Sequence, residues 1–285
     1  MSALPKLAVI GGDHDAADLA DDTGVMRFEV ERTETVHLAH DAVLVLAVLQ
    51  ERAELVARAL EAGKLVLCPF PPAPNLRAFE PIESRAGNGR LLTFGRIADS
   101  EPGARALAVV HDGALGQLLS AWTGVRAQRG DGTPADVLDA YGWDVLDFLL
   151  RLHNGTPERI HARCESLFGC GPSPDTALLI LRFAPSPIAT VELSRCLPAS
   201  IAACDAGETE IELIGTTHTL RAEPGAGHVR VHGSNQVTAR PWSESPLSRA
   251  LDRAADALES GTSDGSVLQR TRRAIAVMNH VRAQS

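Results

Sequence analysis

Residues 41–64 read DAVLVLAVLQERAELVARALEAGK, and this stretch decides the fold. Asp41–Leu49 is a continuous apolar run of strand length, which is typical of a strand covered on both faces. Glu51–Ala62 follows with its apolar residues at helical spacing, and Gly63 stands where such a helix ends. A buried strand followed at once by a helix is the repeating unit of a parallel sheet covered by helices.

The same alternation continues on both sides of this stretch. Before it, we predict a first buried strand at Leu7–Ile10 and a second, at a sheet edge, at Met26–Val30. After it come a strand at Leu65–Cys68, a helix at Leu76–Ala86 and a strand at Leu91–Phe94. This order predicts a Rossmann-like, doubly wound parallel sheet.

The pattern changes after about residue 99. We predict a helix at Ala104–Asp112, a strand at Leu118–Arg126, a strongly amphipathic helix at Val137–Leu152, and two closing helices at Pro246–Ser260 and Gly265–Ala283. Between them lie strand-like runs separated by Gly and Pro clusters, at Ile160–Glu165, Ala177–Phe183, Ala189–Arg195, Glu210–Ile214, Thr219–Ala222 and His228–His232. The second part is therefore predicted to be an α+β domain with a large, mainly antiparallel sheet.

Length and composition agree with two globular domains. A chain of 285 residues is long enough for two, and 45% apolar with 22% charged residues is close to the globular average. We place the shortened Rossmann-type domain at residues 1–98 and the α+β domain at residues 99–285, with the last helix free to pack back on the first domain.

Charge and hydropathy exclude two classes of function. The net charge is −9 and no Lys/Arg run is present, so a general nucleic-acid binder is not expected. No run of 18 apolar residues exists, so no membrane span is expected either.

The start of the chain lacks the pattern of a signal peptide, and the five cysteines have no ligand-like spacing. We expect a cytoplasmic protein with reduced thiols.

Several motifs in this order resemble the glucose–fructose oxidoreductase / inositol dehydrogenase / MocA (Gfo/Idh/MocA) family. They are residues 41–64, Gly95-Arg96, the turn Gly113–Gly116, Gly142 with Asp147, Gly155–Pro157, Glu210–Thr216 and Asp264-Gly265. The resemblance covers nearly the whole chain. It implies a Rossmann domain that binds NAD or NADP, a C-terminal domain whose open sheet often mediates oligomerisation, and sugar oxidoreductase chemistry.

The cofactor loop departs from the family pattern. A dinucleotide site needs G-x-G-x-x-G after the first strand, but Asp13 stands where the second Gly belongs, where a side chain crowds and a carboxylate repels the pyrophosphate. The vestigial cofactor-binding candidates are Gly11, Gly12 and His14. Glu29 and Glu31 lie near the usual place of a ribose-binding acid. The stretch between the first and third strands is also too short to hold a second strand and a full helix. We therefore predict that the part of the pocket that would bind the adenine is reduced.

The residues that would perform the reaction are replaced as well. The resemblance implies a catalytic Lys at position 70 and a catalytic His at position 144, but the sequence has Phe70 and Asp144. The loop that touches the nicotinamide aligns with Ala47, Val48 and Leu49, all apolar. A phenyl ring can donate neither a proton nor a hydrogen bond.

The remaining catalytic candidates are Asp144, Asp147 and Tyr141. Residues 144 and 147 share one face of a helix, and two neighbouring carboxyl groups can form an acid–base pair. The alternative is that both carboxylates cap the helix or face solvent.

Three residues are predicted to line the cleft, namely Arg96, Phe70 and Trp143. We expect no metal site, because His153 and His161 fit a core or surface role better than a ligand role and no cluster has zinc-like spacing.

Three functions stay open. The leading hypothesis is a degenerate Gfo/Idh/MocA homologue, a pseudoenzyme without a cofactor. It would be a binding or structural subunit that assembles through its C-terminal sheet with itself or with an active homologue. The alternative is an atypical NAD(P)-dependent oxidoreductase that acts on a sugar-like or cyclic alcohol with Asp144 as acid/base. A second alternative is a cofactor-free lyase or isomerase in the same cleft.

Overall fold

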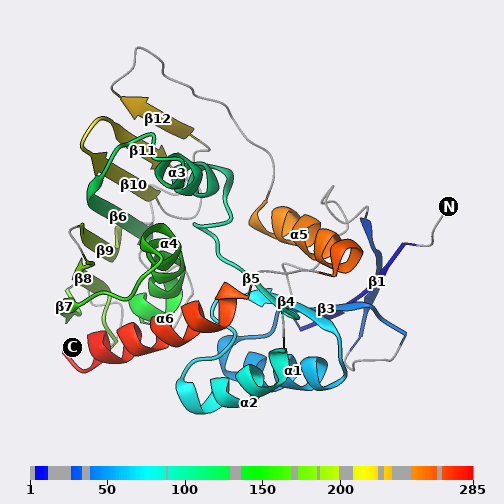
Figure 1. The fold of residues 1–285 in the computed structure, drawn as a ribbon. Coiled ribbons are helices and arrows are strands. Elements are labelled where there is room, and N and C mark those ends of the chain that lie inside the picture. The colour runs from blue at the N-terminus through cyan, green and yellow to red at the C-terminus, as the bar shows by residue number, and fades with distance from the viewer. Residues whose placement is uncertain are drawn as a thin grey trace. The chain divides into compact units, whose positions relative to one another are not determined.

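The structure is a computed structural model that describes residues 4–11, 27–33, 39–87, 89–128, 136–167, 173–184, 187–198, 208–223, 228–232, 245–261 and 265–284 (Figure 1). The chain forms two compact units. Unit 1 comprises Met1–Asp99 and Glu244–Ile275, and unit 2 comprises Ser100–Ser243 and Ala276–Ser285. The sequence analysis placed the boundary between residues 98 and 99 and left the last helix free to pack back on the first domain. In the structure residues 244–275, which include the first part of that helix, belong to unit 1.

Unit 1 contains a five-stranded parallel sheet in the order β2-β1-β3-β4-β5. The strands are β1 (Lys6–Ile10), β2 (Glu29–Arg32), β3 (Ala42–Val45), β4 (Leu65–Pro69) and β5 (Leu91–Phe94). All four residues of β3 are buried and all four of β2 are exposed, as expected for a central and an edge strand. The predicted Rossmann-like parallel sheet is confirmed.

Two strand boundaries differ from the prediction. The second strand was predicted at Met26–Val30, but β2 begins at Glu29, and Met26 lies outside the described residues. The apolar run Asp41–Leu49 was predicted as one strand, but β3 ends at Val45 and the next helix begins at Leu49. Hydrophobicity cannot separate these parts, because Ala47 in the connecting loop is buried like the strand.

Helices cover both faces of this sheet. On one side, α1 (Leu49–Glu61) contacts β3, β4 and the neighbouring α2 (Leu76–Ala86). The other side is covered by α5 (Pro246–Ser260), which comes from more than 150 residues further along the chain. Its apolar stripe forms one core with the sheet, made of Leu7, Val9, Phe28, Ala42, Leu44, Leu65, Leu67, Leu92, Ala250, Leu251, Ala254 and Ala255.

Unit 2 contains a seven-stranded sheet in the order β12-β11-β10-β6-β9-β8-β7. The strands are β6 (Leu118–Gln128), β7 (Arg159–Glu165), β8 (Thr176–Arg182), β9 (Ile188–Leu197), β10 (Glu208–Gly215), β11 (Thr219–Glu223) and β12 (His228–His232). The pair β6–β9 is parallel and the other pairs are antiparallel. The prediction of a mainly antiparallel sheet is confirmed.

Helices of unit 2 begin at other residues than the apolar pattern predicts. Helix α3 (Glu101–His111) starts three residues before its predicted position, because the Ser100 side chain accepts a hydrogen bond from the Gly103 N–H and caps it. The predicted helix Val137–Leu152 consists of a π-helical turn, η3 (Leu138–Gly142), followed by α4 (Trp143–His153). The last helix, α6 (Ser266–Arg282), contributes residues to both units.

The large sheet has one buried face and one open face. Along β8 the buried residues Ala177, Leu179 and Leu181 alternate with Leu178 and Ile180, which are exposed. This alternation is typical of an antiparallel sheet that has a core on one side only. Within the described part of the chain, no helix is long and apolar enough to cross a membrane.

Candidate functional site

The first candidate site is the edge of the unit 1 sheet at which the parallel strands end. Ligands of open α/β sheets bind at this edge. Gly11 follows β1 with a φ of +78°, and a Cβ at this position would lie 2.8 Å from the Ala47 backbone nitrogen. The predicted first glycine is thus required by a close approach of two loops. Gly12 and His14 lie outside the described residues, as do Asp13 and Asp15.

Arg52 holds two of these loops together. Its Nε donates to the carbonyl oxygen of Ala47 at 3.1 Å, and its Nη1 donates to those of Pro69 at 3.1 Å and Pro71 at 2.8 Å. These carbonyl groups lie at the end of β4 and in the loops after β3 and β4, so the guanidinium group connects the ends of both strands. Val48, between β3 and α1, is 62% exposed.

Phe70 lies between the two prolines that Arg52 holds, and only 5% of its surface is exposed. The guanidinium carbon of Arg270 from α6 lies 5.9 Å from the centre of its ring, within the range of a cation–π interaction. Arg270 is itself buried and donates to Ser266 Oγ at 3.0 Å and Thr93 Oγ1 at 3.3 Å. A cation thus lies next to the buried Phe70 ring.

Burial also determines the state of the neighbouring thiol. Cys68 in β4 is completely buried, which raises its pKa to about 12, although Arg52 acts in the opposite direction. The thiol is therefore protonated at neutral pH and unsuited to act as a nucleophile. Arg96 lies exposed in the turn after β5, at the same edge of the sheet.

The two acidic residues considered for the ribose lie at different ends of β2. Glu29 is the first residue of the strand and its carboxylate is 3.9 Å from Lys6 Nζ, far from the carboxyl edge. Glu31 is the third residue, and its carboxylate is 3.0 Å from Nε2 of the buried His40. Only Glu31 has the position that a ribose-binding acid needs.

The second group of candidates lies at the start of α4 in unit 2. Asp144 and Asp147 are both buried, at 9% and 0% exposure. Asp147 Oδ2 lies 2.8 Å from Arg151 Nη2 one turn later in α4, so this carboxylate forms a buried ion pair. Tyr141 is half-buried in the π-helical turn directly before them. Such turns are frequent at functional sites.

Trp143 and the histidines have mainly structural contacts. The Trp143 indole is buried and its Nε1 donates to Asp139 Oδ1 at 3.4 Å. The His153 ring stacks on Phe183 at 4.0 Å, and burial lowers its pKa to about 4. His161 is exposed on β7. Among the described residues, no group of three His, Cys, Asp or Glu side chains is placed to hold a metal ion.

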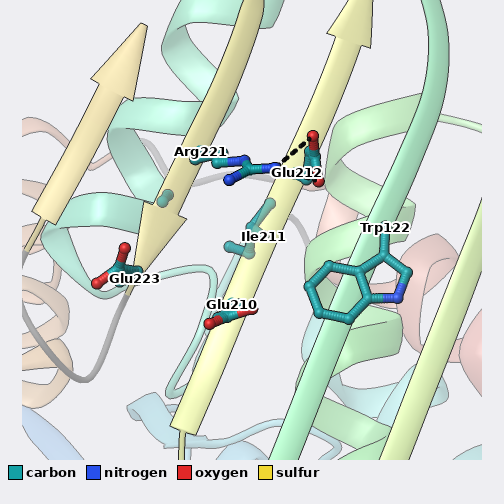
Figure 2. A pocket seen from close by; sticks show the side chains of 7 residues that line it. Trp122, Glu210, Ile211, Glu212, Arg221 and Glu223 are labelled. Carbon is teal, nitrogen blue, oxygen red and sulfur yellow. Dashed lines mark hydrogen bonds and ion pairs between the residues drawn. The ribbon is translucent and has the colours of Figure 1, made fainter. Parts of the chain in front are cut away.

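A pocket of about 400 Å³ that the sequence analysis missed lies on the open face of the unit 2 sheet, over β6, β10 and β11 (Figure 2). Its polar lining consists of Glu210, Glu212, Glu223 and Arg221, with the indole of Trp122 on one side. Strand alternation could have placed these side chains on one face, but strand order, which the sequence does not reveal, brings them together.

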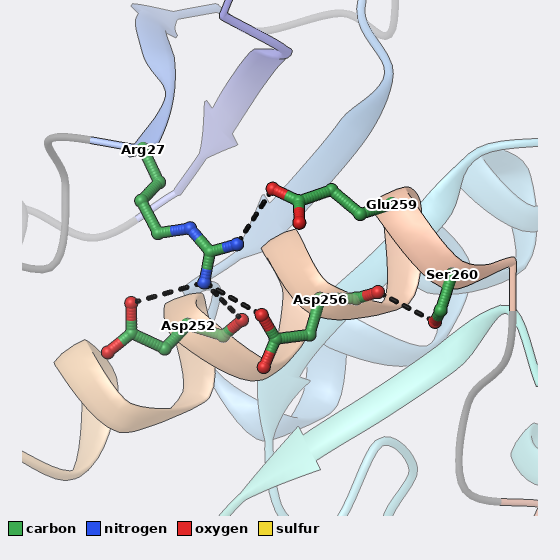
Figure 3. Close-up of polar contacts among 5 residues, drawn as sticks. All are labelled: Arg27, Asp252, Asp256, Glu259 and Ser260. Atoms are coloured by element: carbon green, nitrogen blue, oxygen red, sulfur yellow. Dashed lines mark hydrogen bonds and ion pairs between the residues drawn. The ribbon is translucent and has the colours of Figure 1, made fainter.

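The position of α5 was also missed, and polar contacts from its middle and its C-terminal part hold it in place. Arg27 before β2 donates to Asp256 Oδ1 and to Glu259 Oε1, each at 2.8 Å (Figure 3). The hydrogen bond to Asp256 is the main cause of the raised pKa of Arg27. Nearer the middle of the helix, Arg253 Nη2 lies 2.9 Å from Asp99 Oδ1. The sequence signal was the acidic stripe at positions 252, 256 and 259.

The whole fold is similar to solved oxidoreductases. No family model and no curated protein matches the sequence. UDP-N-acetylglucosamine 3-dehydrogenase from Acidithiobacillus ferrooxidans is 14% identical with a TM-score of 0.81, over 99% of this chain and 98% of that one. A myo-inositol dehydrogenase from Corynebacterium glutamicum is 14% identical with a TM-score of 0.77, over 99% of this chain and 97% of that one. An Agrobacterium radiobacter oxidoreductase in complex with NAD+, L-tartaric acid and magnesium is 18% identical with a TM-score of 0.78, over 99% of this chain and 96% of that one.

These likenesses extend over the full length of both chains, so they concern both units. The predicted resemblance in fold is confirmed, and this chain has the fold of Gfo/Idh/MocA-type oxidoreductases. Fold alone does not determine activity.

Proposed function

We propose that this protein uses an oxidoreductase fold without nicotinamide chemistry and serves as a binding or structural subunit. The observation that carries the proposal is Phe70, a buried ring under the guanidinium group of Arg270, at the position of the family's catalytic Lys. A phenyl ring cannot take part in proton transfer. Arg270 cannot replace the Lys as an acid, because an arginine does not lose its proton in proteins.

The loop after β3 supports the same proposal. Ala47, Val48 and Leu49 carry no side-chain donor or acceptor for a nicotinamide amide, and the nearest cation, Arg52, is bonded to backbone carbonyl groups. In the sequence, Asp13 stands where the resemblance implies the second glycine of the pyrophosphate loop. The described residues at this edge therefore do not fit a working redox dinucleotide. The expected cytoplasmic location belongs to this proposal as well.

Calorimetric titration with NAD and NADP tests the proposal. We expect no binding of either cofactor at concentrations up to about 1 mM, because most of the usual contacts are missing. The Agrobacterium oxidoreductase serves as the positive control, since its structure contains NAD+. Micromolar binding of either cofactor to this chain would overturn the proposal.

A second candidate is an atypical NAD(P)-dependent oxidoreductase with Asp144 as acid/base. Two observations favour it, namely the buried Asp144 directly after a π-helical turn and the similarity in fold to a protein in complex with NAD+. It predicts that purified protein carries a dinucleotide. For any sugar or cyclic alcohol that is turned over, Asp144→Asn should lower kcat by about 100-fold or more. An unchanged kcat would remove Asp144 from this role.

A further inference from the structure

The strand β7 forms one edge of the seven-stranded sheet of unit 2. In an antiparallel pair, every second residue bonds to the neighbouring strand, and the residues between them turn their backbone N–H and C=O groups away from it. At the edge of a sheet these outward groups can pair with another chain. The outer side of β7 is therefore a place where an extended segment of a partner can add to the sheet.

The side chain of Gln284 covers part of this edge. The residue follows the end of α6, which lies near β7 (Figure 1). Its Oε1 accepts a hydrogen bond from the Ala162 N–H at 2.9 Å, and its Nε2 donates to the carbonyl oxygen of Ile160 at 3.1 Å. An added strand would use the same two backbone groups, so the amide of Gln284 takes the place of one residue of such a strand.

The two contacts of Gln284 can be exchanged for those of a strand. Gln284 is exposed, and both of its hydrogen bonds to β7 lie at the surface. Exposed hydrogen bonds contribute little net stability, because water offers the same bonds to the separated groups. A segment of several residues would replace both bonds and add further ones along β7, so it can displace the side chain.

Arginines give this edge a positive charge on the open face of the sheet. Arg159 of β7 lies directly opposite Arg182 of β8, and both are exposed. Like charges that lie directly opposite each other destabilise a sheet. Arg163 pairs with Glu165 on its own strand at 2.6 Å, but in the described part of the chain neither Arg159 nor Arg182 forms an ion pair. Acidic side chains of a partner would offset this repulsion.

The opposite face of the same edge is apolar. Ile160, Ala162 and Cys164 alternate with the exposed residues of β7 and are half-buried. A strand that adds to β7 continues both faces of the sheet, because its side chains alternate in the same way. It would place one set of side chains beside the arginines and the other beside Ile160 and Ala162. The edge therefore suits a segment in which acidic and apolar residues alternate.

We propose that the edge of β7 binds an extended acidic and apolar segment of a partner protein as an added strand, and that Gln284 closes this edge until the segment replaces it. The inference rests on the proposed role as a binding subunit and names the class of its partner. It does not depend on the cofactor site. A chain that binds neither NAD nor such a segment would overturn the inference alone, whereas a chain that binds both would overturn the proposed function alone.

Fluorescence anisotropy of a labelled peptide with the full chain tests the proposal. The probe is a peptide of about ten residues in which Glu and Val alternate, which is long enough to follow a whole strand. The control peptide has Lys in place of Glu. We expect the Glu peptide to bind with a Kd of about 100 µM or lower and the Lys peptide not to bind.

Charge variants of the protein test the role of the arginines. Arg159→Glu and Arg182→Glu should each weaken binding of the Glu peptide about tenfold or more, because each places like charges side by side. Arg105→Glu, on the exposed side of α3, makes the same charge change away from the edge and should leave the affinity unchanged. An affinity that both edge variants leave unchanged would overturn the proposal.

Two further variants separate strand addition from a general attraction of charges. Ala162→Pro removes an N–H that the added strand needs, and proline is tolerated where the N–H of an edge strand faces outward. The peptide should no longer bind, while the circular dichroism spectrum stays that of the wild type. Gln284→Ala removes the competing side chain and should tighten binding about threefold or more.

Hydrogen exchange of the Ala162 amide provides a readout that does not depend on the affinity. Exchange should be faster in Gln284→Ala than in the wild type, and the Glu peptide should slow it in both proteins. No binding to the wild type, equal binding of the Lys peptide, or binding that survives Ala162→Pro would each overturn the added strand. An unchanged affinity of Gln284→Ala would overturn the role of Gln284.

Discussion

At the scale of single residues, the contacts of Phe70 restrict which side chains its position can hold. The ring is buried and Arg270, a residue of the last helix, lies over it. Position 70 thus holds a buried ring that forms a cation–π interaction. A Lys at position 70 would place two cations next to each other in a buried environment.

We therefore expect Phe70→Lys to lower the free energy of unfolding by about 2–4 kcal/mol and to create no NAD-dependent turnover. Phe70→Leu, which removes the ring but adds no charge, should cost less, about 1–2 kcal/mol. Urea denaturation measures both values. A Lys variant as stable as the Leu variant would show that Arg270 does not constrain this position.

His153 predicts the response of the protein to acid. Its pKa is lowered to about 4 by burial, while in the unfolded chain it stays near 6.5. Between these values the unfolded state binds the proton and the folded state does not, so stability falls as the pH drops from about 6.5 to about 4. Above pH 6.5 the titration of His153 no longer changes the free energy of unfolding.

The variant His153→Phe removes this titration and keeps an aromatic ring against Phe183. We expect the variant to gain stability relative to wild type as the pH falls from 7 to 4, by up to about 3 kcal/mol. Urea denaturation at several pH values measures the difference, from which the other titrating groups cancel. A difference that does not change with pH would contradict the burial of this ring.

At the scale of elements, α5 is held in place mainly by its apolar stripe. Leu251 is completely buried in the core between α5 and the parallel sheet, whereas the acidic partners of Arg27 are largely exposed. Burial of a leucine stabilises far more than an exposed ion pair.

We expect Leu251→Ala to lower the free energy of unfolding by about 3 kcal/mol. Arg27→Ala should have a much smaller effect that disappears at high salt, because exposed charges are screened. Thermal or chemical denaturation at low and high ionic strength separates the two variants. An equal loss for both would mean that the ion pairs, rather than the apolar stripe, hold the helix.

At the scale of the whole molecule, the first unit is not continuous in sequence. Leu7, Leu44 and Leu92 on one face of the parallel sheet are covered by residues 250–255. A chain that stops at residue 99 would expose this face to water.

Residues 1–99 alone should therefore aggregate or lack a cooperative unfolding transition. The same residues joined to 244–275 through a flexible linker of about 15 residues should unfold cooperatively, because the second face is then covered. Circular dichroism during thermal unfolding distinguishes the two chains. A stable fold of residues 1–99 alone would show that α5 is dispensable.

Much of the architecture could be predicted from the pattern of apolar residues. Runs such as 42–45 and the alternation in 176–182 report how many faces of a strand are buried, so the parallel and antiparallel sheets followed from them. Boundaries were less accurate where a cap or a buried loop, such as Ser100 or Ala47, does not follow the periodicity.

By itself, the sequence determined the order of the elements and where the resemblance implies a Lys and a His, at the positions held by Phe70 and Asp144, since both depend on local spacing. Only the tertiary structure decided that α5 covers the first sheet, that Arg270 lies over Phe70 and that Trp122, Glu210 and Glu223 line one pocket. The physical reason is that an apolar pattern indicates which surface is buried. Which distant segment buries it depends on the shape and charge of the segments, which the pattern does not give.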